Sequence, residues 1–86
     1  MEFEQFKREM ALAETMAKTD VERESYWIGY RRGLRRAYHG EKFGTAEEHK
    51  KFIDAVNSLD EGRQETGKGY RDALADWGGS HDSEIP

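Results

Sequence analysis

Residues 29–34 read GYRRGL, and the phrase returns in weakened form as GYRDAL at residues 69–74. In each copy a small residue follows the glycine by four positions, which gives the pairs Gly29–Gly33 and Gly69–Ala73. Positions four apart lie on the same edge of a helix, and small residues there let two helix backbones come close together. The repeat therefore predicts two helices that cross closely through these edges.

Helical periodicity extends outward from this phrase over most of the chain. Apolar residues three or four positions apart predict a first helix over about residues 2–17. Residues 19–22, TDVE, have the form of a capping box and predict the start of a second helix, which runs to His39 and ends at Gly40. Start signals at residues 45–48 and 58–61 predict a third helix and a fourth helix that continues to Trp77.

These elements predict an all-α fold, a compact bundle of three to four short helices formed by residues 1–77 as a single domain. Residues 78–86 begin with two glycines and are otherwise mostly polar, so we expect a disordered C-terminal tail there. A chain of 86 residues buries only about two thirds of its surface on folding. Self-association or a protein partner is therefore a reasonable expectation.

Composition narrows the classes of function. The chain has no cysteine, so we expect neither a disulfide framework nor a thiolate site, and nothing requires an oxidising compartment. No run of apolar residues approaches the length that crosses a bilayer, and the first residues do not form a secretory signal. A cytoplasmic location with no membrane partner is the expectation.

Charge is distributed unevenly. The net charge is −4, yet residues 21–42 hold six basic against three acidic residues, while the segments on both sides are acidic. A basic segment inside an acidic chain marks a candidate surface for an anionic partner.

Projected at about 100° per residue, the second helix has three sides. Aromatic and apolar residues form a core side, and the two glycines form another. The third side carries four arginines, here called the arginine face: Arg31, Arg32, Arg35 and Arg36. Guanidinium groups bind carboxylates and phosphates through paired hydrogen bonds, although such a face can also be solvated or paired within its own chain.

The candidate binding residues are the arginine face, His39, and the two aromatic residues Tyr26 and Trp77, which lie at the edges of their helices. Arginine and large aromatic side chains are the residue types that dominate protein interfaces. We therefore expect a small non-catalytic interaction or regulatory protein that binds a protein partner, or a second copy of itself, through this helix.

The alternative is a nucleic-acid-binding helical module that uses the same basic helix, extended by Lys42, Lys50 and Lys51. The acidic segments on both sides oppose this reading, because they repel phosphate. A third, weaker hypothesis is that the acidic C-terminal half imitates a nucleic-acid backbone.

Three motifs resemble known catalytic or binding motifs but lack the surroundings that those motifs require. Residues 62–69 match a phosphate-binding loop, but no strand precedes them and the last position is Gly69 in place of Ser or Thr. The spacing of His39 and His49 fits no common metal motif, and the tripeptide at residues 80–82 is not a catalytic triad, because a triad is a spatial arrangement. We expect no catalytic residue, no cofactor, no metal and no small-molecule substrate.

Overall fold

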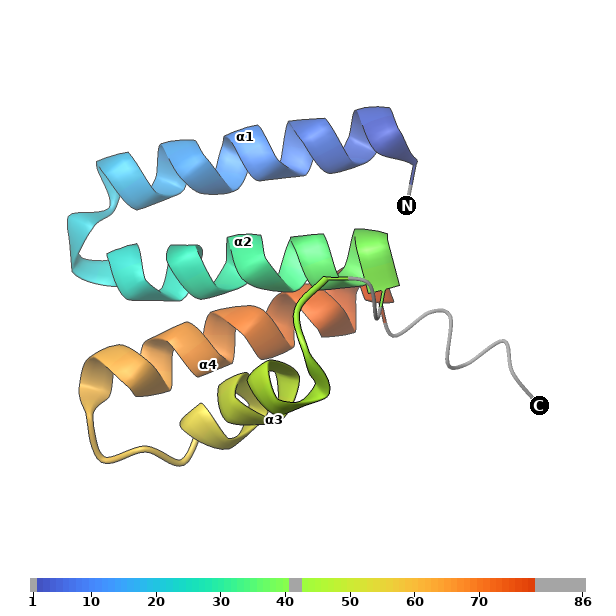
Figure 1. The fold of residues 1–86 in the computed structure, drawn as a ribbon. Helices are drawn as coiled ribbons and strands as arrows, with labels where there is room; N and C mark the ends of the chain where they lie inside the picture. The colour runs from blue at the N-terminus through green and yellow to red at the C-terminus, as the bar shows by residue number, and fades with distance from the viewer. Residues whose placement is uncertain (1, 41–42, 79–86) are drawn as a thin grey trace.

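The computed structural model describes residues 2–40 and 43–78 (Figure 1). These residues form four α-helices and two short irregular helices, in the order α1 (Phe3–Thr19), the 3-10 turn η1 (Val21–Arg23), α2 (Glu24–His39), α3 (Ala46–Ala55), α4 (Glu61–Ala73) and the π-helical turn η3 (Leu74–Gly78). The predicted all-α class is confirmed, and the described part of the chain contains no strand. Of the predicted tail, residues 79–86 lie outside the described residues.

Helix α2 is the central element (Figure 1). Helix α1 runs antiparallel to it on one side, and α4 runs parallel to it on the other. The parallel pairing is possible because α3 and its two connections carry the chain back to the end at which α2 began. Every other helix is therefore placed relative to α2 or to its partner α4.

The contact between α2 and α4 is a contact between backbones. Gly29, Gly33 and Gly69 are all buried. A Cβ atom added at Gly29 would overlap the carbonyl oxygen of Thr66, and one at Gly69 would overlap that of Tyr26. At Gly33 it would lie 2.6 Å from the carbonyl oxygen of Tyr70. The predicted close crossing is confirmed, since no side chain larger than hydrogen fits between the helices.

A second glycine of α4, Gly67, allows α3 to approach α4 in the same way. A Cβ atom at Gly67 would lie 2.8 Å from the backbone nitrogen of Val56 and 2.9 Å from the carbonyl oxygen of Phe52. Glycine lowers helix propensity by roughly 1 kcal/mol relative to alanine, yet α4 is helical from Glu61 onward. The loss of propensity is offset by the approach of two neighbouring helices.

The core is small and consists partly of alanine. Leu34 is fully buried and packs with Ala13 of α1 and Ala73 of α4. Five partly buried residues surround this cluster: Phe6, Met10, Trp27, Tyr30 and Trp77. Because a core of this size contributes little apolar area, the close helix crossing matters more to stability here than in a larger domain.

Two of the three predicted capping signals form helix starts, and one is wrong. The Oγ1 atom of Thr45 accepts a hydrogen bond from the backbone of Glu48, as predicted. At the fourth helix the cap is Asp60, whose side chain accepts from the backbone of Arg63. At the second helix no box forms, because Thr19 is the last residue of α1 and donates its hydroxyl to the carbonyl of Thr15. The chain turns through η1 instead, and α2 begins at Glu24.

Among the described helices, none combines the length and the apolar character needed to cross a membrane.

Replacing Gly69 with alanine will destabilise the fold, because the added methyl group meets backbone atoms that have no room to move. Overpacking of this kind costs about 1–3 kcal/mol, which lowers the melting temperature of a domain this size by about 5 °C or more. Thermal melts followed by circular dichroism measure the effect. Gly62→Ala is the matched control, since its Cβ atom would meet nothing closer than 3.8 Å. The control should melt at the wild-type temperature or higher, and equal melting of the two variants would contradict the backbone contact.

Candidate functional site

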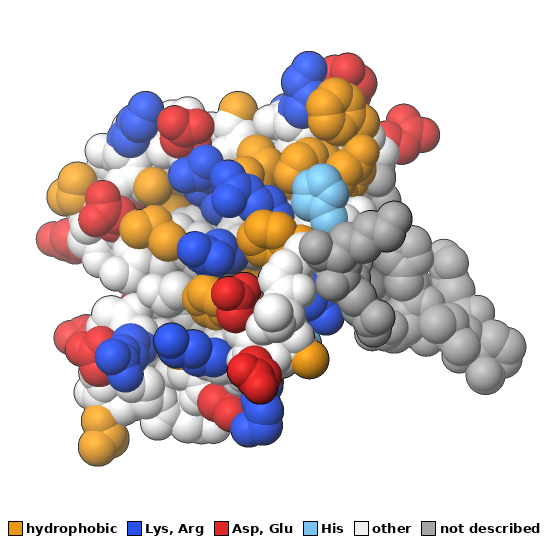
Figure 2. All heavy atoms as spheres, in the orientation of Figure 1, with side chains coloured by type: hydrophobic (Ala, Val, Ile, Leu, Met, Phe, Trp, Pro, Cys, Tyr) orange, Lys and Arg blue, Asp and Glu red, His pale blue; other side chains and the backbone are white. Residues whose placement is uncertain are grey.

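The arginine face lies on the side of α2 that neither the glycines nor the core occupies. Figure 2 shows Lys and Arg side chains gathered over α2, beside a histidine and a group of hydrophobic side chains. Arg32 is exposed, whereas Arg31 and Arg35 are partly buried. We call these three residues the outer arginines.

The outer arginines are held partly by apolar contact. The guanidinium of Arg32 lies over the ring of Phe52 in α3, 5.5 Å from its centroid. The Nε atom of Arg31 is buried and has no hydrogen-bond partner among the described residues. Side chains that are already ordered lose less entropy when a partner binds them.

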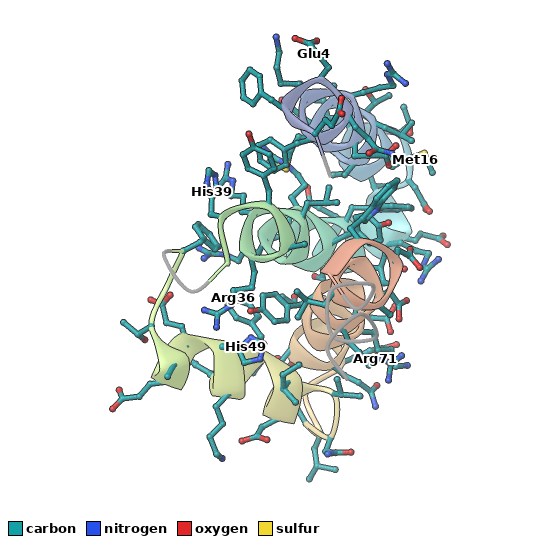
Figure 3. All side chains as sticks on the ribbon, turned by 90° about the vertical axis from the view of Figure 1, so that its right-hand side faces the viewer. Glu4, Met16, Arg36, His39, His49 and Arg71 are labelled. Carbon is teal, nitrogen blue, oxygen red and sulfur yellow. The ribbon has the colours of Figure 1, made fainter. Side chains whose placement is uncertain are left out.

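Arg36 has a different role from the other three. Its Nη1 atom donates a hydrogen bond of 3.1 Å to the carbonyl oxygen of Phe43, in the connection between α2 and α3. Figure 3 shows Arg36 next to His49 in the space between α2 and α3. Of the predicted arginine face, Arg36 therefore supports the loop and α3, and the outer arginines remain as the candidate site.

Ion pairs are numerous on the other elements. Among the described residues, seven basic side chains lie within 4.0 Å of a carboxylate: Lys7, Lys18, Arg23, Lys50, Arg63, Lys68 and Arg71. None of the four residues of the arginine face has such a partner in residues 2–40 and 43–78. The pairing leaves the unneutralised positive charge of the described chain concentrated on α2.

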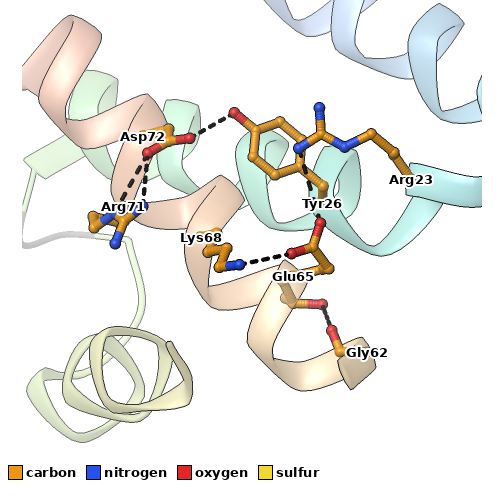
Figure 4. Close-up of polar contacts among 8 residues, drawn as sticks. Arg23, Tyr26, Gly62, Glu65, Lys68, Arg71 and Asp72 are labelled. Carbon is orange, nitrogen blue, oxygen red and sulfur yellow. Dashed lines mark hydrogen bonds and ion pairs between the residues drawn. The ribbon is translucent and has the colours of Figure 1, made fainter. Parts of the chain in front are cut away.

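Tyr26 and Trp77 lie away from the outer arginines, where Tyr26 of α2 contacts α4 and Trp77 of η3 contacts α2. The hydroxyl of Tyr26 donates to Asp72 at 2.7 Å, and the ring of Tyr26 carries Arg23 on its face (Figure 4). One turn later, the hydroxyl of Tyr30 donates to Asp76 and accepts from the indole nitrogen of Trp77. The structure does not bring these two aromatic residues together with the arginine face.

The same contacts keep the tyrosine hydroxyls protonated. Burial, with a smaller contribution from Asp76, raises the pKa of Tyr30 to about 12. Burial and the hydrogen bond to Asp72 raise the pKa of Tyr26 further. Through these hydrogen bonds the two side chains fix α2 against α4 and η3.

His39 is exposed at the end of α2, inside an aromatic cluster. Its ring meets the edges of Phe6 and Tyr38 at centroid distances of 5.7 and 4.9 Å, and Phe43 lies 6.3 Å away. The cluster adjoins the arginine face, so His39 stays in the candidate site and brings aromatic surface with it.

His49 makes a partly buried polar contact with α4. Its Nδ1 atom lies 2.7 Å from the hydroxyl of Tyr70, a residue that is only 2% exposed. Tyr70 also stacks on Phe52, with ring centroids 4.8 Å apart. Burial and the positive charge of Arg36 lower the pKa of His49, which favours the neutral imidazole beside the Tyr70 hydroxyl. This bond joins α3 to α4.

A groove of about 700 Å³ lies between α2, α3 and the beginning of α4. Arg32 and Lys51 stand on its two sides, and Phe52 and Ala55 contribute its apolar surface. Phe52 was not among the predicted site residues, because on sequence it reads only as part of the apolar stripe of its helix. The position of α3 relative to α2, which makes the groove, follows from contacts distant in sequence.

The motifs that resemble catalytic or binding motifs lie in helices or outside the described residues. Residues 62–69, which match a phosphate-binding loop, lie inside α4, where Gly67 and Gly69 pack against neighbouring helices. Within residues 2–40 and 43–78, no three His, Asp or Glu side chains converge as metal ligands would. Lys42 and residues 80–82 lie outside the described residues.

Comparison of the chain with protein-family models, curated proteins and solved structures gives no match in any of the three.

Removing the hydroxyl of Tyr70 will weaken the attachment of α3. Tyr70→Phe keeps the ring on Phe52 but loses the hydrogen bond to His49, at a cost of about 1 kcal/mol. The melting temperature should fall by about 4–8 °C at pH 7.5. A melting temperature equal to that of the wild type would show that this hydrogen bond does not stabilise the fold.

His49 also makes stability depend on pH. Because the folded state holds the pKa of His49 below its ordinary value of 6.5, the unfolded chain takes up a proton first as the pH falls. The contribution of His49 is therefore complete above about pH 7 and declines as the pH falls through 6.5. Melting temperatures at pH 7.5 and 5.5 should differ less in His49→Gln than in wild type, and an equal difference in the two proteins would contradict this role of His49.

Proposed function

We propose that this protein is a non-catalytic interaction protein that binds a partner protein through the outer arginines of α2 and the adjoining aromatic surface. The observation that carries the proposal is the charge pattern. Most basic residues on the other described elements have a carboxylate neighbour, while Arg31, Arg32 and Arg35 have none in the described chain. Concentrated positive charge without a partner, in a chain of net charge −4, fits a surface that meets acidic groups of another molecule.

The chemistry of these side chains suits a protein interface. A guanidinium group can hold a carboxylate through two parallel hydrogen bonds, and each such bond gains strength when water is excluded. The aromatic cluster around His39 supplies apolar area beside the charges. Arginine and aromatic side chains in one patch are the composition of interface hot spots.

A non-catalytic role is supported by how the titratable groups with shifted pKa values are used. Tyr26, Tyr30, Tyr70 and His49 make hydrogen bonds that join one helical element to another, and Lys50 is paired with Asp54 within α3. With no cysteine, the chain does not depend on an oxidising compartment, and we propose that it meets its partner in the cytoplasm.

The expected partner is a protein, and a second copy of this chain is one form that it can take. Nucleic acid is the alternative, since the same guanidinium groups also bind phosphate. Lys50, which would extend a phosphate-binding surface, is already paired with Asp54 at 2.7 Å. That pairing, together with the acidic net charge, favours the protein partner.

Reversing the charge of two outer arginines will abolish partner binding without unfolding the domain. The variant is Arg32→Glu combined with Arg35→Glu, because neither side chain makes a hydrogen bond within the described chain. Recovery of the partner in an affinity pull-down from host lysate, run with and without nuclease and read by mass spectrometry, should fall at least about tenfold in both cases. Analytical ultracentrifugation of the same variant tests whether the partner is a second copy.

Arg8→Glu is the matched control, since Arg8 is exposed on α1 and likewise has no ion pair among the described residues. It should leave recovery unchanged. Binding that persists in the double variant would place the interface elsewhere, and bound material that disappears with nuclease would favour the nucleic-acid alternative.

A further inference from the structure

The groove between α2 and α3 is more positive than a count of its charged residues suggests. Three basic and three acidic side chains line it, which suggests a neutral surface. Two of the acids are already engaged, however. Asp54 is paired with Lys50, and Asp60 caps the backbone of Arg63 and lies near its guanidinium group.

The charges that remain are mostly positive. Arg32 stands on the α2 side and Lys51 on the α3 side, and neither is paired within the described residues. Glu48 is the one acid of the lining without such an engagement there. Arg31 and Arg35 lie next to Arg32 on α2, so the groove opens onto a positively charged border.

The surface between these cations is apolar. Phe52 lies under the guanidinium of Arg32 and is backed by the ring of Tyr70, which holds it in place. Ala55 continues the apolar surface along α3. A ring fixed from behind offers contact area without a further loss of side-chain entropy on binding.

We propose that the groove between α2 and α3 binds a short acidic segment of the partner protein. A large apolar side chain of the segment packs beside Phe52 and Ala55. Acidic side chains of the same segment pair with Arg32 and Lys51 on the two sides of the groove. This inference rests on the proposed function and names the kind of segment that the partner presents. The volume of about 700 Å³ lies within the range of about 300–1,000 Å³ that holds a drug-sized ligand. The groove can therefore take a few side chains of one short segment, and not a folded domain.

Selection from a displayed library of random 16-residue peptides tests the proposal, with the whole chain immobilised as the target. The enriched peptides should carry an excess of Asp and Glu around a Leu, Phe or Trp. Their affinity, measured by fluorescence anisotropy with the labelled peptides, should fall at least about tenfold for Lys51→Glu and for Arg32→Glu. It should stay within about twofold of wild type for Arg8→Glu.

The two charge reversals separate this inference from the proposed function. Lys51 lies on α3, outside the arginine face, and its side chain is exposed, so Lys51→Glu should keep the wild-type circular dichroism spectrum. A partner that is lost with Arg32→Glu and Arg35→Glu but kept with Lys51→Glu would leave the proposed function standing and overturn the groove. Enriched peptides without acidic residues, or a library that yields no binder, would also overturn it.

Discussion

The close contact between the backbones of α2 and α4 is the constraint on which the other features of this protein depend. At Gly29 and Gly69 the two helices touch without any intervening side chain. That distance brings the hydroxyl of Tyr26 within hydrogen-bond reach of Asp72 (Figure 4), and the hydroxyl of Tyr30 within reach of Asp76. The polar pairs in turn hold the two helices in register. A small apolar core is sufficient because backbone packing and these hydrogen bonds supplement it.

The same contact decides which side of α2 faces outward. One side of the helix is taken by the glycine edge against α4, and another by the aromatic and apolar residues that pack on α1. The third side carries Arg31, Arg32 and Arg35. Placing several like charges on one helix is unfavourable unless acids neutralise them, and the described chain supplies those acids to its other helices. Such a distribution costs stability in the free protein, and it is the basis on which we propose an acidic partner.

Helix α3 connects stability with the proposed binding surface. It is held to α4 by Gly67, by the stacking of Phe52 on Tyr70 and by the hydrogen bond of His49. Phe52 also lies beneath Arg32 and lines the groove. A change that loosens α3 would therefore disturb the groove as well, which is why charge reversals on exposed side chains distinguish binding from folding better than substitutions of the aromatic residues.

The sequence by itself determined the helices and the crossing through Gly29 and Gly69, because periodicity and glycine spacing are local properties that a helix converts directly into faces. It also showed four arginines on one side. Tertiary structure decided that Arg36 supports the loop to α3 and that α2 begins after a 3-10 turn. It also decided that Tyr26 bonds to α4 and that Trp77 of η3 bonds back to α2. It alone formed the groove, since Arg32 and Phe52 meet only when α3 folds back. Contacts between distant residues depend on how helices are placed in space, and no local pattern records that placement.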